Sequence, residues 1–67
     1  MPYVNIKITK EDVTSKQKEE LIEGVTILLQ HVLNKKQATI FVIIDEVETD
    51  NWGIAGKQVS EIRKREK

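Results

Sequence analysis

The stretch Thr-Ile-Phe-Val-Ile-Ile, residues 39–44, decides the fold. It is an unbroken run of β-branched and aromatic residues, which is typical of a strand that is covered on both faces, as in a parallel sheet. The acidic segment that follows, residues 45–50, interrupts the pattern. We therefore expect a buried strand over residues 39–44 that ends before the acidic segment.

A second strand is predicted near the N-terminus, where residues 3–8 alternate in character. One face carries Val4, Ile6 and Ile8, and the other carries Tyr3, Asn5 and Lys7. This period of two is that of a half-buried strand. The polar residues 10–13 that follow predict a loop.

A long helix is predicted between the two strands. Thr14 is followed three residues later by Gln17, a spacing that allows a capping box at the start of a helix. Asn34 tolerates the left-handed conformation that closes helices, so we expect the helix over residues 15–33. Apolar residues recur along it at steps of three and four, as on one face of a helix: Leu21, Ile22, Val25, Leu28, Leu29, Val32 and Leu33.

Strand, helix and strand in this order predict one β-α-β unit, so the fold class is α+β. Residues 51–56 (Asn-Trp-Gly-Ile-Ala-Gly) then indicate a turn or short hairpin, and residues 58–67 a short amphipathic end with a charged tail. We expect residues 1–67 to form a single domain. Because a stable sheet needs three or more strands and covered edges, the missing strands must come from another subunit. A dimer then shares one four-stranded sheet.

Composition favours an oligomer. A chain of 67 residues buries a small share of its surface, and without cysteine it has no disulfide or thiolate metal site to stabilise it. The 11 Lys and Arg balance the 11 Asp and Glu, so no net field attracts nucleic acid or an anionic membrane. The apolar runs are too short to span a membrane, and the N-terminus does not resemble a secretory signal. We expect a cytoplasmic protein that packs against copies of itself.

Common catalytic motifs are absent. The sequence has no zinc-ligand spacing, no phosphate-binding glycine loop and no nucleophile elbow. A Ser-His-Asp triad would depend on His31, the single histidine, which lies at the margin of the apolar stripe. We interpret His31 as a partly exposed surface residue.

Pro2 is the single proline, and it directly precedes the first predicted strand. One interpretation is that it simply starts the strand. The other is chemical: removal of Met1 by an aminopeptidase turns the ring nitrogen into a secondary amine, whereas within a chain it is an amide with no basicity. A free α-amino group titrates at about 7.7–8.0, and an apolar pocket favours its neutral form. That places it near the pH at which a general base works best.

Four segments together resemble a known family. They are residues 1–8 (Met-Pro-Tyr-Val-Asn-Ile-Lys-Ile), 17–25 (Gln-Lys-Glu-Glu-Leu-Ile-Glu-Gly-Val), 42–47 (Val-Ile-Ile-Asp-Glu-Val) and 51–56. In this order and spacing they are similar to the short 4-oxalocrotonate tautomerases, over nearly the whole chain. The resemblance implies a β-α-β subunit, a dimer with a shared sheet and a hexamer built as a trimer of dimers. It also implies that Pro2 takes a proton from the hydroxyl of an enol or dienol and returns it to carbon.

The resemblance assigns further residues around the substrate. Trp52 matches an aromatic residue that walls the family's pocket, and its alternative role is packing in the core or at an interface. Family members that accept dicarboxylates carry two arginines, and the corresponding positions here fall near Asp12 or Val13 and on Phe41. Because neither position can bind an anion as arginine does, we expect lost affinity for dianionic substrates. Phe41 instead lines the pocket or packs in the core.

Cations remain as candidates for binding the substrate. Arg63 matches a C-terminal arginine of the family. The other cations near the predicted site are Lys7, Lys10 and Lys36. For each of the four, Arg63 included, the alternative is a solvated surface charge, which is the usual state of such side chains. The tail over residues 63–67 (Arg-Lys-Arg-Glu-Lys) is weak evidence for binding nucleic acid, because it is short and interrupted by an acid.

The sequence leads to one main hypothesis and two alternatives. The main hypothesis is a keto-enol tautomerase without cofactor or metal, in which Pro2 acts as general base on a small enol or dienol 2-hydroxy acid and not on a dicarboxylate. The first alternative keeps Pro2 but uses it for hydration, dehalogenation or decarboxylation, reactions that depend on arginines and an acidic residue that activates water. The second is a catalytically weak or non-enzymatic oligomeric binding protein on the tautomerase scaffold, which the absent arginines favour.

Overall fold

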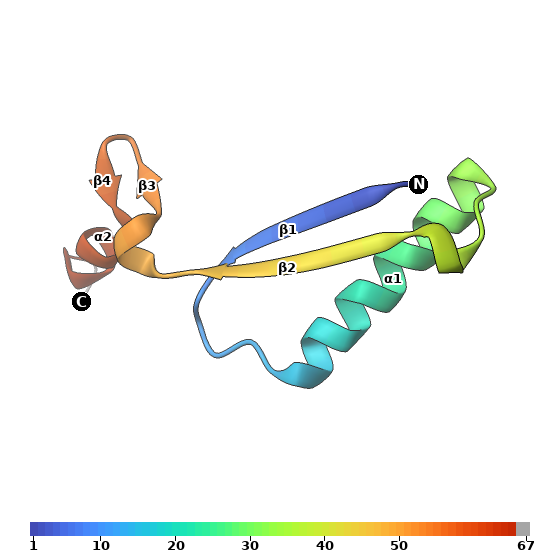
Figure 1. The fold of residues 1–67 in the computed structure, drawn as a ribbon. Coiled ribbons are helices and arrows are strands. Elements are labelled where there is room, and N and C mark those ends of the chain that lie inside the picture. The colour runs from blue at the N-terminus through green and yellow to red at the C-terminus, as the bar shows by residue number, and fades with distance from the viewer. Residues whose placement is uncertain (66–67) are drawn as a thin grey trace.

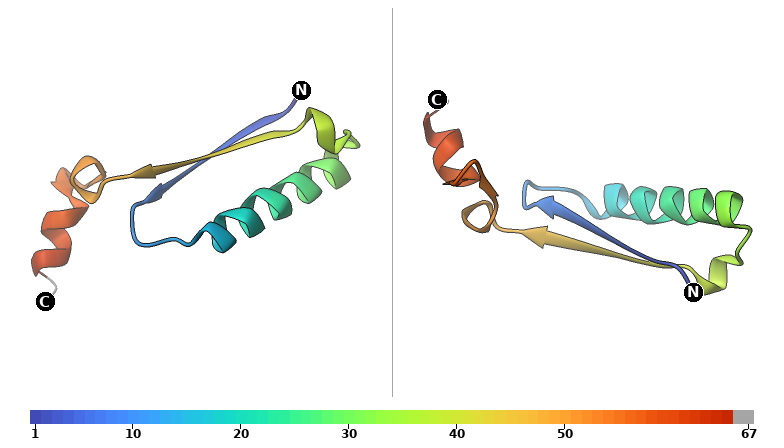
Figure 2. Two further views of the ribbon diagram at one scale, coloured as in Figure 1. Left: turned by 60° about the horizontal axis from the view of Figure 1, so that its bottom comes forward. Right: turned by 90° about the horizontal axis from the view of Figure 1, so that it is seen from above.

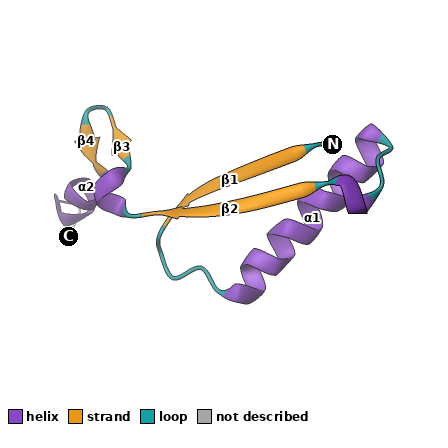
Figure 3. Cartoon of the chain, viewed as in Figure 1, coloured by secondary structure: helices purple, strands orange, loops and turns teal. Residues whose placement is uncertain are grey.

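The computed structural model describes residues 1–65. Its elements follow in the order strand, helix, strand, hairpin and helix (Figure 1, Figure 3). The bounds are β1 Tyr3–Thr9, α1 Ser15–Leu33, β2 Phe41–Val47, β3 Gly53–Ile54, β4 Lys57–Gln58 and α2 Val59–Arg65, with 3₁₀ turns at Gln37–Thr39 and Thr49–Asn51. This order confirms the predicted α+β class, the β-α-β unit and the hairpin after it.

β1 and β2 form a two-stranded parallel sheet. Their register runs from Tyr3 opposite Phe41 to Thr9 opposite Val47. α1 connects the two strands and lies along one face of the sheet (Figure 2). The chain therefore has two layers, one of strands and one of helix.

β2 begins later than the strand predicted over residues 39–44. A 3₁₀ turn over Gln37–Thr39 precedes it, and this turn uses the backbone N–H groups of Thr39 and Ile40 in bonds of 3.0 and 3.1 Å. Those two groups are thereby taken from the sheet, although β-branched residues favour a strand here. A local turn has overridden the strand propensity.

β2 also ends later than predicted, because the acidic residues stay in the strand. Asp45 lies opposite Lys7 of β1, which donates to its carboxylate at 3.0 Å. Glu46 forms an ion pair with Lys18 of α1. The prediction that the acidic segment ends the strand is therefore wrong, since neighbouring elements supply positive charge for both carboxylates.

α1 has the bounds that the sequence predicts. The Thr14 hydroxyl accepts a hydrogen bond from the Gln17 N–H at 3.1 Å, and the Gln17 side chain accepts one from the Thr14 N–H at 2.9 Å. At the other end, Asn34 adopts φ 54° and ψ 44°, in the left-handed region. Both predicted end signals are confirmed.

The two faces of the sheet are unequal. Side chains alternate along a strand, and the contact between Lys18 and Glu46 places α1 over the face that carries Glu46. The opposite face is uncovered in the single chain, and three large side chains on it are 60%, 48% and 48% exposed, namely Tyr3, Phe41 and Ile43. The single chain covers one face of the sheet with its one helix, and cover of the second face stays a prediction about an assembly.

The core of the single chain is small. Among residues 1–65, the buried apolar side chains are Ile40 and Val59. The apolar stripe of α1 is wider than a two-stranded sheet can cover, and much of it stays exposed, as at Leu21, Ile22, Ile27, Leu28, Val32 and Leu33. Apolar areas of this kind mark interaction surfaces. Within the described part of the chain, neither helix has the length and apolar character to cross a membrane.

The residues after β2 form a unit that we call the C-terminal arm, residues 48–65. β3 and β4 pair in antiparallel fashion, and the turn between them places Ala55 at φ 52° and Gly56 at φ 82°. Two successive residues with positive φ are typical of a tight hairpin turn. The hairpin thus lies slightly later than the predicted residues 51–56.

α2 completes the arm. It accounts for most of the amphipathic end predicted over residues 58–67, whose last two residues lie outside the described part of the chain. The arm extends beyond the end of β2, away from α1 (Figure 1, Figure 2). The chain is consequently elongated, with extents of 46 × 25 × 14 Å.

Candidate active site

Pro2 is half-buried immediately before β1. Its carbonyl oxygen accepts a hydrogen bond of 3.0 Å from the N–H of Phe41, the first residue of β2. Met1, ahead of it, is 83% exposed. The fold therefore holds Pro2 through its own carbonyl, and loss of Met1 leaves this contact in place.

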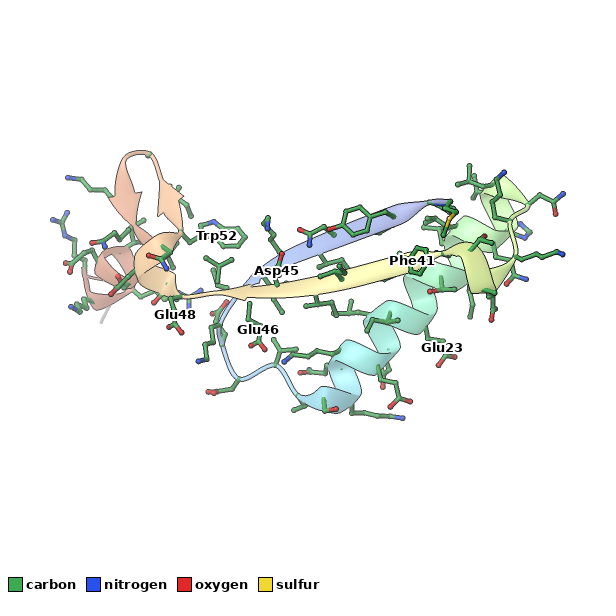
Figure 4. The ribbon with its side chains drawn as sticks, in the orientation of Figure 1. Glu23, Phe41, Asp45, Glu46, Glu48 and Trp52 are labelled. Carbon is green, nitrogen blue, oxygen red and sulfur yellow. The ribbon has the colours of Figure 1, made fainter. Side chains whose placement is uncertain are left out.

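The structure brings Phe41 next to Pro2. Phe41 pairs with Tyr3 in the sheet, and its ring lies on the face that α1 does not cover, at the end of β2 nearest the N-terminus (Figure 4). Its side chain is not part of the core of the single chain, because the residue is 48% exposed. The ring is open to a ligand or to another copy.

Trp52 and Arg63, the other two predicted site residues, belong to the C-terminal arm at the opposite end of the sheet. The seven residues of β2 span about 20 Å at 3.3 Å per residue, and the arm begins beyond them. Trp52 and Phe41 accordingly lie at opposite ends of the strand (Figure 4). A single chain therefore divides the predicted site into two halves.

Trp52 is partly buried at the base of the hairpin. Its backbone N–H donates to the Thr49 carbonyl at 3.4 Å, and its own carbonyl accepts from the Val59 N–H at 2.8 Å. Val59 is 6% exposed. Two backbone bonds thus fix the backbone of Trp52 within the arm.

Arg63 is engaged by Glu11, in the loop after β1. The guanidinium donates to one oxygen of the Glu11 carboxylate, and the Thr9 hydroxyl donates to the other. The hydrogen bond from Arg63, followed by that from Thr9, holds the pKa of Glu11 below its ordinary value. Sequence reasoning missed Glu11. The available signal was the acidic character of this loop, at the place where dicarboxylate enzymes of the family carry an arginine.

A polar groove lies between this loop and the arm, and we call it the loop groove. It is lined by Lys10, Glu11, Asp12, Thr49, Ser60, Arg63 and Lys64. Asp12 adopts φ 61°, a conformation that is uncommon for residues other than glycine. The Ser60 hydroxyl is buried and has no hydrogen-bond partner among residues 1–65. The groove therefore combines both signs of charge with a hydroxyl that can form one more bond.

A second polar cluster lies on the helix-free face of the sheet. Asp45 accepts hydrogen bonds from Asn5 at 2.9 Å and from Lys7 at 3.0 Å. The bond from Asn5, followed by the bond from Lys7 and the positive charge of Lys7, holds the pKa of Asp45 below its ordinary value. Lys7 is therefore occupied by a carboxylate.

The remaining predicted cations lie elsewhere on the surface. Lys10 forms an ion pair of 3.2 Å with Glu48, and Lys36 is exposed in the loop before β2. His31 is exposed in the last turn of α1, as predicted. In the described residues, no group of three or more His, Cys, Asp and Glu could hold a metal ion.

Known proteins share this sequence and fold. The model of the tautomerase enzyme family matches residues 2–62. A relative from Dickeya dadantii, named as probable tautomerase K2, is 62% identical over 97% of each chain. The crystal structure of DmpI from Helicobacter pylori matches with a TM-score of 0.87 and 48% identity, over 94% of this chain and 97% of that one.

A more distant structure shows what the fold can build. The heterohexamer 4-oxalocrotonate tautomerase from Chloroflexus aurantiacus matches with a TM-score of 0.86 and 24% identity, over 94% of this chain and all of that one. That protein therefore builds a heterohexamer from chains of this fold. The resemblance noted in the sequence is confirmed by the family match over residues 2–62 and by the 62% identity to a named tautomerase. This chain belongs to the tautomerase family of isomerase enzymes.

Proposed function

We propose that this chain is a cofactor-independent keto-enol tautomerase in which Pro2 acts as general base once Met1 is removed. The placement of Pro2 carries the proposal, because the residue is half-buried and its carbonyl is fixed by the Phe41 N–H. A free α-amino group has an ordinary pKa of about 7.7–8.0, and an apolar pocket favours its neutral, basic form. A rigid ring also points the nitrogen lone pair in one direction.

The proposed reaction moves one proton within the substrate. The Pro2 nitrogen takes the proton of the enol hydroxyl, and the oxygen electrons form the carbonyl group. The electrons of the carbon–carbon double bond then take the proton back from Pro2 at carbon. Atoms and charge balance, since Pro2 is neutral at the start and at the end.

The proposed active site forms between copies of the chain. A small substrate cannot reach from Pro2 and Phe41 to Trp52 and Arg63 within one chain, because β2 alone spans about 20 Å. The arm of one copy therefore covers the Pro2 end of another. A dimer with a shared four-stranded sheet, assembled into a homohexamer, provides such contacts, and the uncovered apolar surfaces of the sheet and α1 support it.

The proposed substrate is a small enol or dienol that carries at most one carboxylate, such as a 2-hydroxy acid that is not a dicarboxylate. Where dicarboxylate enzymes of the family carry arginines, this chain has the acidic loop around Asp12 and the apolar Phe41. Asp12 repels a carboxylate, and Phe41 has no donor for one. We place the activity in the cytoplasm, where newly made chains lose their initiator methionine.

Ketonisation of phenylenolpyruvate tests the role of Pro2. In Pro2→Ala we expect kcat/KM to fall by about 100-fold, because a positioned general base contributes at least that much. Lys16→Ala, on an exposed part of α1, is the control and should keep the wild-type rate. The intact mass of each preparation comes first, since a retained Met1 makes the Pro2 nitrogen an amide. Equal rates for wild type and Pro2→Ala, both without Met1, would rule out the proposed base.

The second candidate is an oligomeric binding protein with little or no catalysis. The absence of arginine near residue 12 and at Phe41 favours it, because such arginines hold the substrate and draw its electrons. It predicts no saturable turnover with any enol in a panel, and no protection of Pro2 from an electrophilic label by substrate analogues. Turnover by the wild-type chain excludes this candidate.

A further inference from the structure

Two ion pairs join the loop after β1 to the C-terminal arm. Lys10 pairs with Glu48 at 3.2 Å, and Glu11 pairs with Arg63. Both pairs lie at the loop groove, but they differ in the arm residue that they engage. The second occupies Arg63, the arginine of the arm that is proposed to meet the substrate.

Glu11 is held as a carboxylate from two sides. Arg63 donates to one of its oxygens and the Thr9 hydroxyl to the other. Both bonds favour the ionised form, and the pKa of Glu11 is lowered accordingly, chiefly by Arg63. At neutral pH, Glu11 is therefore ionised, and its negative charge lies against the Arg63 guanidinium.

A guanidinium that holds one carboxylate is a poor receptor for another. Arginine binds carboxylates through paired N–H donors, so a substrate carboxylate must displace Glu11 or approach it against repulsion. Asp12 adds a second negative charge to the same groove, and the two lysines that line it, Lys10 and Lys64, are paired with Glu48 and Glu61. The groove as built therefore disfavours a second anionic group.

The arm nevertheless contains the donors that a carboxylate needs. Ser60 precedes Arg63 by three residues in α2, so the two side chains share one face of the helix, and both line the loop groove. The Ser60 hydroxyl is buried without a hydrogen-bond partner in the described part of the chain. Without the charge of Glu11, the N–H donors of the Arg63 guanidinium face an incoming carboxylate from the lining of the loop groove.

We propose that Glu11 sets the charge specificity of this enzyme: by holding Arg63 in the loop groove, it keeps a second substrate carboxylate out. Glu11 is a positioning residue, since it acts through Arg63 and not on the reacting atoms. The predicted change in substrate preference rests on the proposed function, because it requires turnover. The predicted effect of Glu11 on the binding of unreactive anions does not rest on it.

The kinetic test compares 2-hydroxymuconate, a dienol with two carboxylates, with phenylenolpyruvate, which has one. The measured quantity is the ratio of the two kcat/KM values. In Glu11→Gln, which keeps the size of the side chain, we expect the ratio to rise about fivefold or more, through a lower KM for 2-hydroxymuconate. Glu11→Asp retains the charge and should keep a ratio near that of wild type. An unchanged ratio in Glu11→Gln overturns the proposal.

Glu48→Gln is the matched control. It removes a carboxylate from the other ion pair between the same loop and the arm, and it leaves Glu11 on Arg63, so its ratio should stay within about twofold of wild type. In the double variant Glu11→Gln, Arg63→Ala, the ratio of the two kcat/KM values should no longer rise above that of wild type. The proposal fails when Glu48→Gln raises the ratio as much as Glu11→Gln does, or when the gain survives Arg63→Ala, because either result assigns the effect to net charge.

A binding measurement separates this proposal from the proposed function. Adipate, an unreactive dicarboxylate, and hexanoate, a monocarboxylate, are titrated into isotope-labelled wild type and Glu11→Gln, and the Arg63 side-chain NMR signal is followed. We expect the Kd for adipate to fall about fivefold or more in Glu11→Gln, with little change for hexanoate. No turnover of either enol by wild type contradicts the proposed function alone. Equal responses of both proteins to adipate contradict the role of Glu11 alone.

Discussion

Two acidic side chains, Asp45 and Glu11, are kept ionised by hydrogen-bond donors from other parts of the chain. Asp45 on β2 is bonded by Asn5 and Lys7 of β1. Glu11 is bonded by Arg63, which lies far along the sequence in α2. Each carboxylate thus ties two segments together while it remains ionised.

Asp45→Asn tests the pH dependence of this arrangement. The bonds from Asn5 and Lys7 lower the pKa of Asp45 in the folded chain, so its carboxylate stabilises the fold above the unfolded pKa of about 3.9, and this contribution is lost as the pH falls through the lower, folded pKa. We therefore expect the melting temperature of wild type to fall more steeply below about pH 4 than that of Asp45→Asn.

The comparison needs a control variant at another acidic residue. Glu11 is present in both wild type and Asp45→Asn, so it contributes equally to the pH dependence of their melting temperatures. Asp50→Asn, in the exposed 3₁₀ turn after β2, serves as the control and should retain the wild-type slope. Parallel melting curves of wild type and Asp45→Asn at every pH would show that Asp45 does not contribute.

Sequence reasoning found residues that are recognised by their own chemistry or position. It missed residues that matter only through a contact with a distant part of the chain. Pro2 was predicted from its chemistry, and its proximity to Phe41 follows from the register of β1 and β2. Glu11 was missed because an acidic loop residue has no distinguishing mark until Arg63 is seen against it. The predicted roles of Pro2, Phe41 and Arg63 remain proposals.

α1 and β2 differ in which residues determine their ends. α1 carries its own start and stop signals in Thr14, Gln17 and Asn34, so the sequence predicts it to the residue. The ends of β2 depend on a turn before it and on charges from β1 and α1 beside it. A strand is defined by its partners, and those are not visible in its own pattern.

Thr14→Ala tests how much the cap stabilises α1. Loss of the hydroxyl leaves the Gln17 N–H without its acceptor, and this costs about 1 kcal/mol of unfolding free energy. For a domain of this size the melting temperature should fall by about 4–8 °C. The measurement is made at one protein concentration, because oligomers unfold in a concentration-dependent way.

Ser15→Ala is the matched control for the cap. Ser15 is the first residue of α1, and the capping box is formed by Thr14 and Gln17 alone. Its melting temperature should stay close to wild type. Equal losses in the two variants would mean that the cap contributes nothing beyond helix propensity.

The single chain has more apolar surface than it can cover. The sequence predicted this need for partners from the small number of strands. It did not predict that the arm would project past the sheet, because that direction depends on contacts such as Glu11 with Arg63, which join distant segments. Nor did it predict that the two halves of the candidate site would lie at opposite ends of one chain.

Ile43→Lys tests the helix-free face as an interface. Ile43 is 48% exposed on that face in the single chain, and a charge buried there in an assembly is costly to desolvate. We expect native mass spectrometry to show hexamers for wild type and smaller species for Ile43→Lys. Ile43→Leu keeps the volume and apolar character, so it should assemble like wild type. Intact hexamers of Ile43→Lys would show that this face lies outside the interface.

The anchoring of Pro2 has a practical consequence for producing the protein. The carbonyl of Pro2 is bonded to Phe41, while Met1 protrudes into solvent. A purification tag joined to the N-terminus therefore leaves the sheet undisturbed but makes the Pro2 nitrogen an amide. We expect such a preparation to fold like the untagged chain and to be inert in the proposed reaction. Activity screens accordingly need a C-terminal tag, or a protease that leaves Pro2 as the first residue.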